Sequence, residues 1–196
     1  MTAVDLPRIR RALSPDAPSL RPGDAGQYAA VAAVLRSGPT GAEVLLIRRA
    51  EHEHDPWSGH MAFPGGRFDP SDADLLSTAV RETREEVGLD LAREARLLGP
   101  LDLLPAVARG RRVGLTIAPF VFELAEAPEL RQNHEVEEVL WAPLTALARG
   151  ESRGTVSYVH EGQKLELPAW NVDGRLVWGL TYRMLVSLIE RVTALR

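Results

Sequence analysis

A periodic segment between residues 72 and 87 constrains this chain more than any other stretch of its sequence. Apolar or small side chains recur there at intervals of four, three and four residues, at Leu76, Val80, Thr83 and Val87. This spacing predicts a helix with one buried stripe. Gly88 follows at once, and glycine commonly ends a helix in a left-handed turn.

The opposite side of this predicted helix is acidic. Glu82, Glu85 and Glu86 stand three and four residues apart, so they share one face, roughly 140° around the axis from the apolar stripe. Three carboxylates this close repel one another and need a cation. Arg81, four residues before Glu85, is one source, and a hard divalent metal with oxygen ligands is another. The two can act together, and a solvated, ion-paired helix face is the plain alternative.

Two adjacent glycines, Gly65 and Gly66, lie directly after a Phe-Pro pair, and Arg81 follows Gly66 by fifteen residues. Glycine lets a backbone carbonyl approach an ion, or an amide approach a phosphate, where a side chain would block it. The surrounding segment, residues 51–72, is rich in His, Asp, Pro and Gly and is longer than most connections. We therefore expect this loop and the acidic helix to form two halves of one site.

The remaining pattern predicts one mixed α/β domain of the α+β type over residues 27–196, with a mixed central sheet covered by helices, preceded by an arm over residues 1–26. Strands are expected at 28–35, 43–47, 95–101, 115–124, 136–141, 156–160 and 165–170, and a loop over 105–114. Further helices are expected at 6–13, 143–148 and 178–195.

Composition excludes several classes of function. The 196 residues carry a formal charge of −4, so no overall positive field draws nucleic acid. The chain contains no cysteine, which removes disulfides, thiolate nucleophiles and zinc–sulfur sites. No apolar run approaches the roughly 18 residues that cross a bilayer, and the first residues do not resemble an export signal. We expect a cytoplasmic protein with no membrane or nucleic-acid partner, and its oligomeric state stays open.

The glycine turn and the acidic helix together resemble the Nudix hydrolase family. Its box is matched by Gly66 and by Arg81, Glu82, Glu85, Glu86, Gly88 and Leu89. Asp72 stands where the box has its first glutamate, eight residues rather than seven separate it from Arg81, and Thr83 replaces a bulky apolar residue. Because Asp is shorter and the spacing is shifted, we expect Asp72 to cap the helix rather than bind metal.

An upstream segment resembles the coenzyme A signature of one branch of that family. It reads Leu45-Leu-Ile-Arg-Arg49-Ala50, then Gly59, then Phe63-Pro-Gly-Gly66. Ile47 replaces a threonine, His54 or Asp55 stands in the place of a second arginine, and one residue is inserted before Gly59. The resemblance implies a Nudix-like α/β/α sandwich and substrate contacts from Arg49, Gly59, Phe63, Gly65, Gly66 and Arg67.

The resemblance also implies a reaction. Mg²⁺ or Mn²⁺ would be held by Glu82, Glu85, Glu86 and the Gly65 carbonyl, with Arg81 orienting a glutamate. Glu82 and Glu135 are the two candidates for the base that deprotonates the attacking water. Coenzyme A would yield 3′,5′-ADP and 4′-phosphopantetheine.

Alternatives remain open beside this reading. They are ADP-ribose or another nucleoside diphosphate as the substrate, and a non-enzymatic nucleotide-binding domain. Arg109, Arg111 and Arg112 are either phosphate contacts or a solvated loop tip. The histidines at 52, 54 and 60 favour a phosphate-facing or lid loop over a zinc site.

Overall fold

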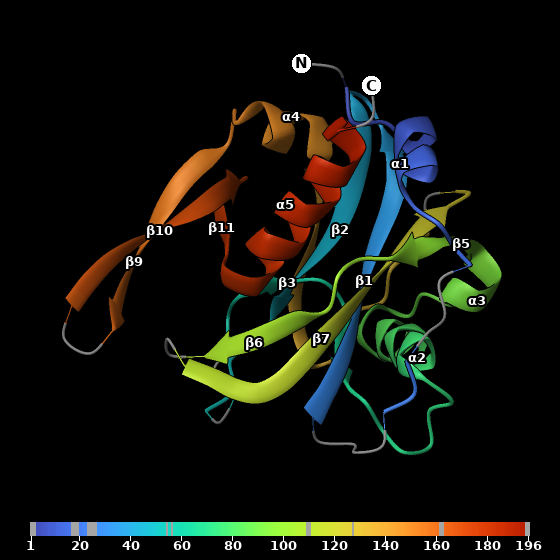
Figure 1. Ribbon diagram of the computed structural model, residues 1–196, viewed down its shortest axis with the longest axis horizontal. Coiled ribbons are helices and arrows are strands. Elements are labelled where there is room, and N and C mark those ends of the chain that lie inside the picture. The colour runs from blue at the N-terminus through green and yellow to red at the C-terminus, as the bar shows by residue number, and fades with distance from the viewer. Residues whose placement is uncertain are drawn as a thin grey trace.

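The computed structural model describes residues 3–16, 20–22, 27–53, 55, 57–108, 111–126, 128–160 and 163–194. Its helices are α1 (Leu6–Ala12), α2 (Leu75–Val87), α3 (Leu91–Glu94), α4 (Leu144–Arg149) and α5 (Gly179–Ala194). Its strands are β1 (Tyr28–Gly38), β2 (Gly41–Arg49), β3 (Met61–Ala62), β4 (Gly65–Arg67), β5 (Ala95–Pro100), β6 (Leu104–Ala108), β7 (Arg111–Leu124), β8 (Val136–Pro143), β9 (Arg153–His160), β10 (Gln163–Val172) and β11 (Arg175–Trp178). Figure 1 shows their arrangement.

The main sheet is mixed, as predicted. Its central path runs β3-β2-β1-β7-β5, while β4 pairs with β1, β6 with β7 and β8 with β2. β1 and β7 are parallel, in register from Tyr28 with Thr116 to Leu35 with Glu123, and the other pairs are antiparallel. A second sheet, β11-β10-β9, lies beside it.

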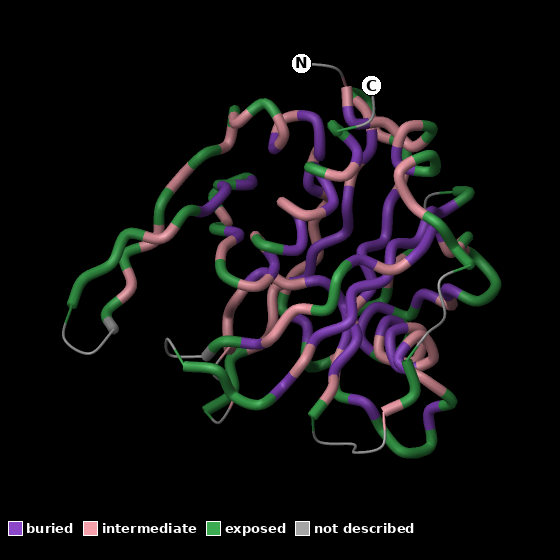
Figure 2. The backbone as a smooth tube through the Cα atoms, viewed as in Figure 1, coloured by how far each residue is buried: buried purple, intermediate pink, exposed green. Residues whose placement is uncertain are grey.

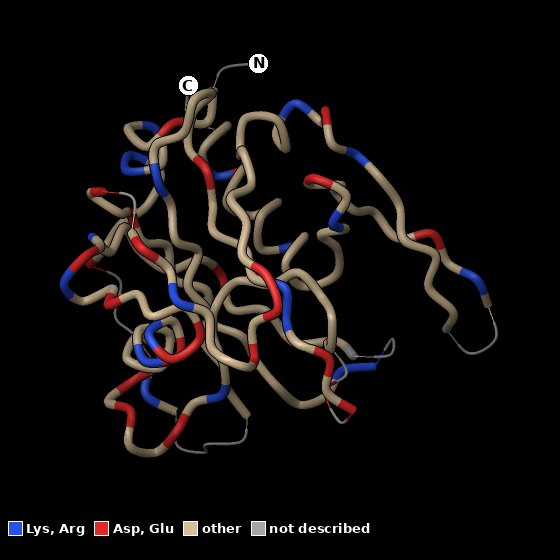
Figure 3. Tube along the Cα trace, turned by 180° about the vertical axis from the view of Figure 1, so that it is seen from behind, with Lys and Arg blue, Asp and Glu red and all other residues tan. Residues whose placement is uncertain are grey.

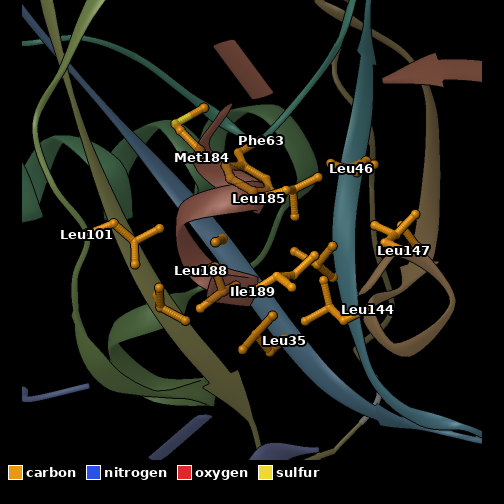
Figure 4. Packing of buried hydrophobic residues seen from close by; sticks show 14 of the residues in the cluster. Leu35, Leu46, Phe63, Leu101, Leu144, Leu147, Met184, Leu185, Leu188 and Ile189 are labelled. Atoms are coloured by element: carbon orange, nitrogen blue, oxygen red, sulfur yellow. The ribbon is translucent and has the colours of Figure 1, made fainter. Parts of the chain in front are cut away.

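Strand β1 is the centre of the sandwich because both of its faces are buried. Ala33 and Leu35 belong to one apolar cluster, and Ala32 and Val34 belong to another. This alternation follows from the two-residue period of a strand. Figure 4 shows α5 on the first face, with Leu188 and Ile189 near Leu35 and Leu185 beside Phe63. Helix α2 packs on the other face, which gives the predicted α/β/α layers.

The N-terminal segment contributes to the core. Asp5 caps α1 by accepting the Arg8 backbone N–H at 2.9 Å, and Pro7 in the first turn loses no helical hydrogen bond. Val4 and Ile9 are fully buried, and α1 packs against α5 and β1. The separation of residues 1–26 from a domain over 27–196 stays a prediction.

The start of α2 differs from the prediction. Asp74, not Asp72, is the N-cap, and its carboxylate accepts the Ser77 backbone N–H at 2.8 Å. Asp72 is buried before the helix and pairs with Arg81 instead. Eight residues separate Asp72 from Arg81, and Asp72 lies beside the helix, within reach of Arg81, rather than at its end.

The buried face of α2 is also rotated from the predicted stripe. Thr83 and Val87 are buried as expected, but Leu76 and Val80 are only partly covered. The buried residues of the helix are instead Leu75, Thr78, Ala79, Thr83, Glu86 and Val87. Glu86 therefore faces the interior, because the glycines of β4 allow the helix to approach and supply a hydrogen bond to its carboxylate.

One further feature was not expected. Most of the predicted loop over 105–114 forms a hairpin of β6 and β7, with Leu104 opposite Ile117 and Val107 opposite Arg112. The strands expected at 156–160 and 165–170 are present as β9 and β10, which form a hairpin that projects from the body, and Figure 2 shows its outer part as exposed or half-exposed. Exposed turns and edge strands leave weak patterns in a sequence because few of their side chains are buried. Within the described residues, no helix is long and apolar enough to cross a bilayer.

Candidate active site

A cavity of about 830 Å³ opens beside α2, β4 and the loop that follows β2. One part of its wall is charged and is formed by Arg49, Arg67, Glu82, Glu85, Glu86 and Glu135. Another part is apolar and is formed by Trp57, Leu115, Ile117, Trp178, Leu180 and Met184. A second cavity, of about 910 Å³, lies near α1 and α3, away from the acidic helix. The chemistry predicted from the sequence therefore belongs to the first.

Glu86 is the buried carboxylate of this cavity, with 1% of its surface exposed. One carboxylate oxygen accepts the Gly65 backbone N–H at 2.8 Å. Burial raises the pKa of Glu86 to about 8, although the Gly65 N–H and the nearby Arg49 favour the charged form. Glu82 and Glu135 raise this pKa further by repulsion, so all three carboxylates act on one another.

Arg81 gathers the other acidic groups. Its Nε and Nη2 donate to the two oxygens of Asp72 at 3.0 and 2.9 Å, and Nη1 reaches Glu82 at 2.9 Å and Glu85 at 3.2 Å. Nη2 also donates to the Arg67 carbonyl at 3.2 Å, which ties α2 to β4. Figure 3 shows acidic and basic segments side by side along α2. The predicted Arg81–Glu85 pair is therefore present within a larger network.

Two pKa values reflect this network. Burial works to raise the pKa of Asp72, but hydrogen bonds from Arg81 and Thr78 outweigh it and hold the pKa below its usual range. Burial raises the pKa of Glu82, and Arg81 only partly offsets that effect. Asp72 thus remains a charged anchor, while Glu82 binds a proton more readily than an ordinary glutamate.

The two glycines are required for different reasons. Gly65 has φ of +150°, and a Cβ there would lie 2.3 Å from the Ala30 carbonyl oxygen of β1. A Cβ on Gly66 would lie 2.5 Å from the carboxyl carbon of Glu82. Gly65 is therefore needed for strand β4 to pair with β1, whereas Gly66 makes room for the Glu82 side chain.

Arg49, at the end of β2, stands next to the buried carboxylate. Its Nη1 lies 3.9 Å from a Glu86 oxygen, and its Nε and Nη2 contact Asp55 at 2.9 and 2.7 Å. Asp55 also accepts the Trp57 backbone N–H at 3.0 Å. The loop after β2 thus places one guanidinium at the edge of the acidic cluster.

Most of the predicted site residues come together at this cavity. Its walls include Arg49, Phe63, Gly65, Gly66, Arg67, Glu82, Glu85, Glu86 and Glu135. Phe63 is only 1% exposed and packs in the core, and Arg81 acts from behind the glutamates. Gly59 shapes the loop, with φ of +71°. Their roles toward a ligand stay predictions.

Of the other predicted arginine and histidine candidates, some line the cavity and others do not. Arg111 and Arg112 lie on the β6–β7 hairpin and are not among the residues that line the cavity, and Arg109 and His54 lie outside the described residues. His60 lines the cavity, with its ring 4.7 Å from the Trp178 ring between centroids. Burial lowers the pKa of His60, so it is a neutral wall residue rather than a cationic phosphate contact.

Sequence reasoning missed the apolar wall. Trp178, the last residue of β11, and Thr181 and Met184 of α5 reach the cavity, and the Thr181 hydroxyl donates to the Met61 carbonyl of β3 at 3.0 Å. These residues are more than 110 positions from β3, and the pattern of residues 179–194 is that of any core helix. No local signal marks them as part of a site.

Comparison with known proteins identifies the family. The model of the NUDIX domain matches residues 27–159. The chain belongs to the Nudix family. This confirms the resemblance seen in the glycine turn and the acidic helix. Nudix hydrolases act on pyrophosphate bonds and generally use divalent metal ions.

Two known relatives align with different shares of this chain. The mitochondrial coenzyme A diphosphatase NUDT8 of Mus musculus is 32% identical over 186 residues, which is 92% of this chain and 84% of that protein. The uncharacterized protein C14C4.10c of Schizosaccharomyces pombe is 45% identical over 107 residues, which is 53% of this chain. This chain spans only 32% of the fission yeast protein's length.

Solved structures share the fold. A MutT/nudix family protein from Enterococcus faecalis superimposes with a TM-score of 0.56 at 17% identity, covering 90% of this chain and 66% of that one. A binary complex of the C. elegans Ap4A hydrolase gives 0.51 at 22% identity, covering 63% of this chain and 84% of that one. Both confirm the predicted Nudix-like sandwich.

The chemistry of the site's residues suits a divalent metal, but their side chains are not arranged around one metal position. Carboxylate oxygens are the donors that Mg²⁺ and Mn²⁺ prefer, and the buried Glu86 lacks a full counter-charge. However, among the described residues no three His, Asp or Glu side chains are arranged as a metal cluster. Arg81 holds Glu82 and Glu85, so these two must turn from Arg81 to join Glu86 on a metal.

Proposed function

We propose that this Nudix hydrolase cleaves the diphosphate of coenzyme A to 3′,5′-ADP and 4′-phosphopantetheine. One observation carries the proposal: 92% of this chain aligns with the mouse coenzyme A diphosphatase. The cavity supports it, because about 830 Å³ is within the usual range for a cofactor-sized ligand. Its charged and apolar walls suit a ligand with a diphosphate and less polar ends.

Mg²⁺ or Mn²⁺ would be held by Glu82, Glu85, Glu86 and the Gly65 carbonyl, and would neutralise the diphosphate charge as the transition state spreads it. The chain's own contribution begins with Arg49, whose guanidinium lies beside Glu86 and can donate to a phosphate oxygen. Arg81 pairs with Glu82 and Glu85 from behind and orients them in the metal-free protein, and both carboxylates would turn from it to hold the metal. Together these residues set the diphosphate against the acidic face.

Hydrolysis requires a base for the attacking water. The water oxygen bonds to phosphorus, the bridging P–O bond breaks, and the water proton passes to a carboxylate. Glu82 suits this role because burial raises its pKa, and Glu135 is the alternative, since its charge acts on both Glu82 and Glu86. Comparing Glu82→Gln with Glu135→Gln tests the assignment. If Glu135 is the base, Glu135→Gln slows turnover and keeps Mn²⁺ binding; if Glu82 is the base, Glu135→Gln keeps turnover, and Glu82→Gln loses turnover together with Mn²⁺ affinity.

A substrate panel tests the function. The protein is incubated with coenzyme A, ADP-ribose and diadenosine polyphosphates, each with Mg²⁺ or Mn²⁺, and the products are identified by chromatography and mass spectrometry. We expect 3′,5′-ADP and 4′-phosphopantetheine from coenzyme A at the highest kcat/KM. Fast cleavage of ADP-ribose with inert coenzyme A would overturn the substrate assignment. No cleavage of any compound would favour a binding domain.

An arginine variant refines the panel. Arg49→Met keeps the apolar stem and removes the guanidinium, so it should raise KM for coenzyme A more than it lowers kcat. Arg67→Met, at another arginine of the wall, is the matched comparison. Equal losses on every substrate for Arg49→Met would show that this arginine does not distinguish coenzyme A.

A further inference from the structure

Asp55 makes several contacts within the loop that follows β2. One carboxylate oxygen accepts the Arg49 Nε at 2.9 Å and lies 2.7 Å from Nη2, and the other accepts the Trp57 backbone N–H at 3.0 Å. Its backbone N–H donates to the His52 carbonyl at 3.1 Å, and its carbonyl accepts the Ser58 N–H at 3.1 Å. These contacts fix the carboxylate in the middle of the loop.

The pairing with Asp55 leaves Arg49 close to Glu86 without a hydrogen bond. Their nearest atoms, Nη1 and Oε1, are 3.9 Å apart. A charge-assisted hydrogen bond between the two groups would form at about 2.8 Å, so a shift of only about 1 Å separates the present arrangement from a direct bond. Glu86 is almost fully buried, and among the described residues Gly65 is the one hydrogen-bond donor to its carboxylate, so Glu86 would be a strong acceptor for a released guanidinium.

A direct Arg49–Glu86 bond would compete with a metal. A cation needs the carboxylate lone pairs that the guanidinium would occupy, and Arg49 would also bring its positive charge nearer.

We propose that Asp55 is a positioning residue that holds Arg49 off Glu86 and thereby keeps the Glu86 carboxylate available to a divalent cation. The proposal rests on the proposed function, because it takes Glu86 as a metal ligand. Asp55 itself touches neither the metal nor the substrate in this assignment. It acts through the guanidinium of Arg49.

The test measures Mn²⁺ binding to the full chain without substrate, from the electron paramagnetic resonance signal of free Mn²⁺. Asp55→Asn should weaken Mn²⁺ binding by roughly fivefold, the scale of one partly exposed ion pair. Glu53→Gln removes the same charge from an exposed position of the same loop and should change binding by less than about twofold. Urea unfolding confirms that both variants are folded.

A double-mutant cycle shows whether Asp55 acts through Arg49. In the Arg49→Met background no guanidinium is left to release, so adding Asp55→Asn should change Mn²⁺ binding by less than about twofold. Asp55→Glu, which keeps the charge, should recover part of the wild-type affinity. If Asp55 only stabilised the loop, Asp55→Asn would weaken Mn²⁺ binding whether or not Arg49 is present. The comparison of Mn²⁺ affinities therefore separates the two roles.

The outcomes are distinct. The proposal is overturned if Asp55→Asn binds Mn²⁺ as the wild type does, if Glu53→Gln weakens binding equally, or if Asp55→Asn weakens it equally without Arg49. If Glu86→Gln binds Mn²⁺ as tightly as the wild type, the metal assignment fails and this proposal fails with it. If Glu86→Gln loses Mn²⁺ while Asp55→Asn does not, only this proposal fails.

Discussion

At the residue scale, Glu86 combines two properties that oppose each other. It is almost fully buried, and its charge is needed if it is to bind a cation. Burial raises the pKa of Glu86 from 4.5 to about 8. Between these two pH values, the folded protein keeps the Glu86 proton, whereas the unfolded chain has released it. The free energy of unfolding of the metal-free protein therefore falls as the pH rises from about 4.5 to 8.

Glu86→Gln should make the metal-free protein more stable and far less active. The amide carries no charge, so at pH 8.5 in EDTA the free energy of unfolding should rise by roughly 2–4 kcal/mol, with little change near pH 4.5. Activity should fall at least about 100-fold, because the metal loses a charged ligand. Urea unfolding at both pH values and initial rates check this; a variant less stable than wild type at pH 8.5 would contradict it.

At the element scale, strand β4 and helix α2 form the site as a pair. The Gly65 N–H reaches Glu86 on the helix, and the Arg81 guanidinium of the helix reaches back to the Arg67 carbonyl of the strand. Asp72, in the connection between them, closes the same network through Arg81. The position of each carboxylate therefore depends on how closely the strand and the helix approach.

Alanine at the two glycines should separate folding from chemistry. Gly65→Ala sets a Cβ 2.3 Å from rigid backbone at a positive φ, and should lower the free energy of unfolding by about 3 kcal/mol or more. Gly66→Ala meets only the mobile end of Glu82, so stability should change by less than about 1 kcal/mol while kcat falls clearly. Unfolding curves and steady-state rates distinguish them, and equal stability losses would refute the distinction.

The elements that bury long periodic faces could be predicted from the sequence. Contacts between residues that lie far apart along the chain could not. The buried strands β1 and β2, the acidic helix and its stop at Gly88 follow from local pattern alone. The partner of Asp72 does not, because a carboxylate before a helix can cap it or pair with Arg81, and the path of the chain decides. Trp178 reaches the cavity from the end of β11 and Met184 from α5, and no local spacing reveals that these elements pack beside the site.

At the scale of the whole molecule, the first and last helices are joined through the core. Helix α1 packs against α5, and the Val4 carbonyl accepts the Ala42 N–H of β2 at 2.8 Å. The Val4 N–H in turn donates to the Thr145 hydroxyl of α4 at 3.1 Å. Residues near the start of the chain thus stabilise the sheet far from the active-site cavity.

Ile9→Ala measures that contribution. Ile9 is fully buried, so the cavity left by alanine should lower the free energy of unfolding by about 2–4 kcal/mol. Arg11→Ala, at an exposed position of the same helix, is the matched control and should change stability by less than about 0.5 kcal/mol. If Ile9→Ala were as stable as the control, the segment would be an arm independent of the domain.

The four tryptophans divide between the cavity and the rest of the fold. Trp57 and Trp178 line the cavity, and Tyr158 lies 5.9 Å from Trp178 between ring centroids. Trp141 lies under the Arg36 guanidinium, and Trp170 packs against Tyr182. Two intrinsic fluorophores therefore border the space a ligand would enter, so quenching of their emission would report ligand entry in the unlabelled chain. The other two would supply a steady background signal.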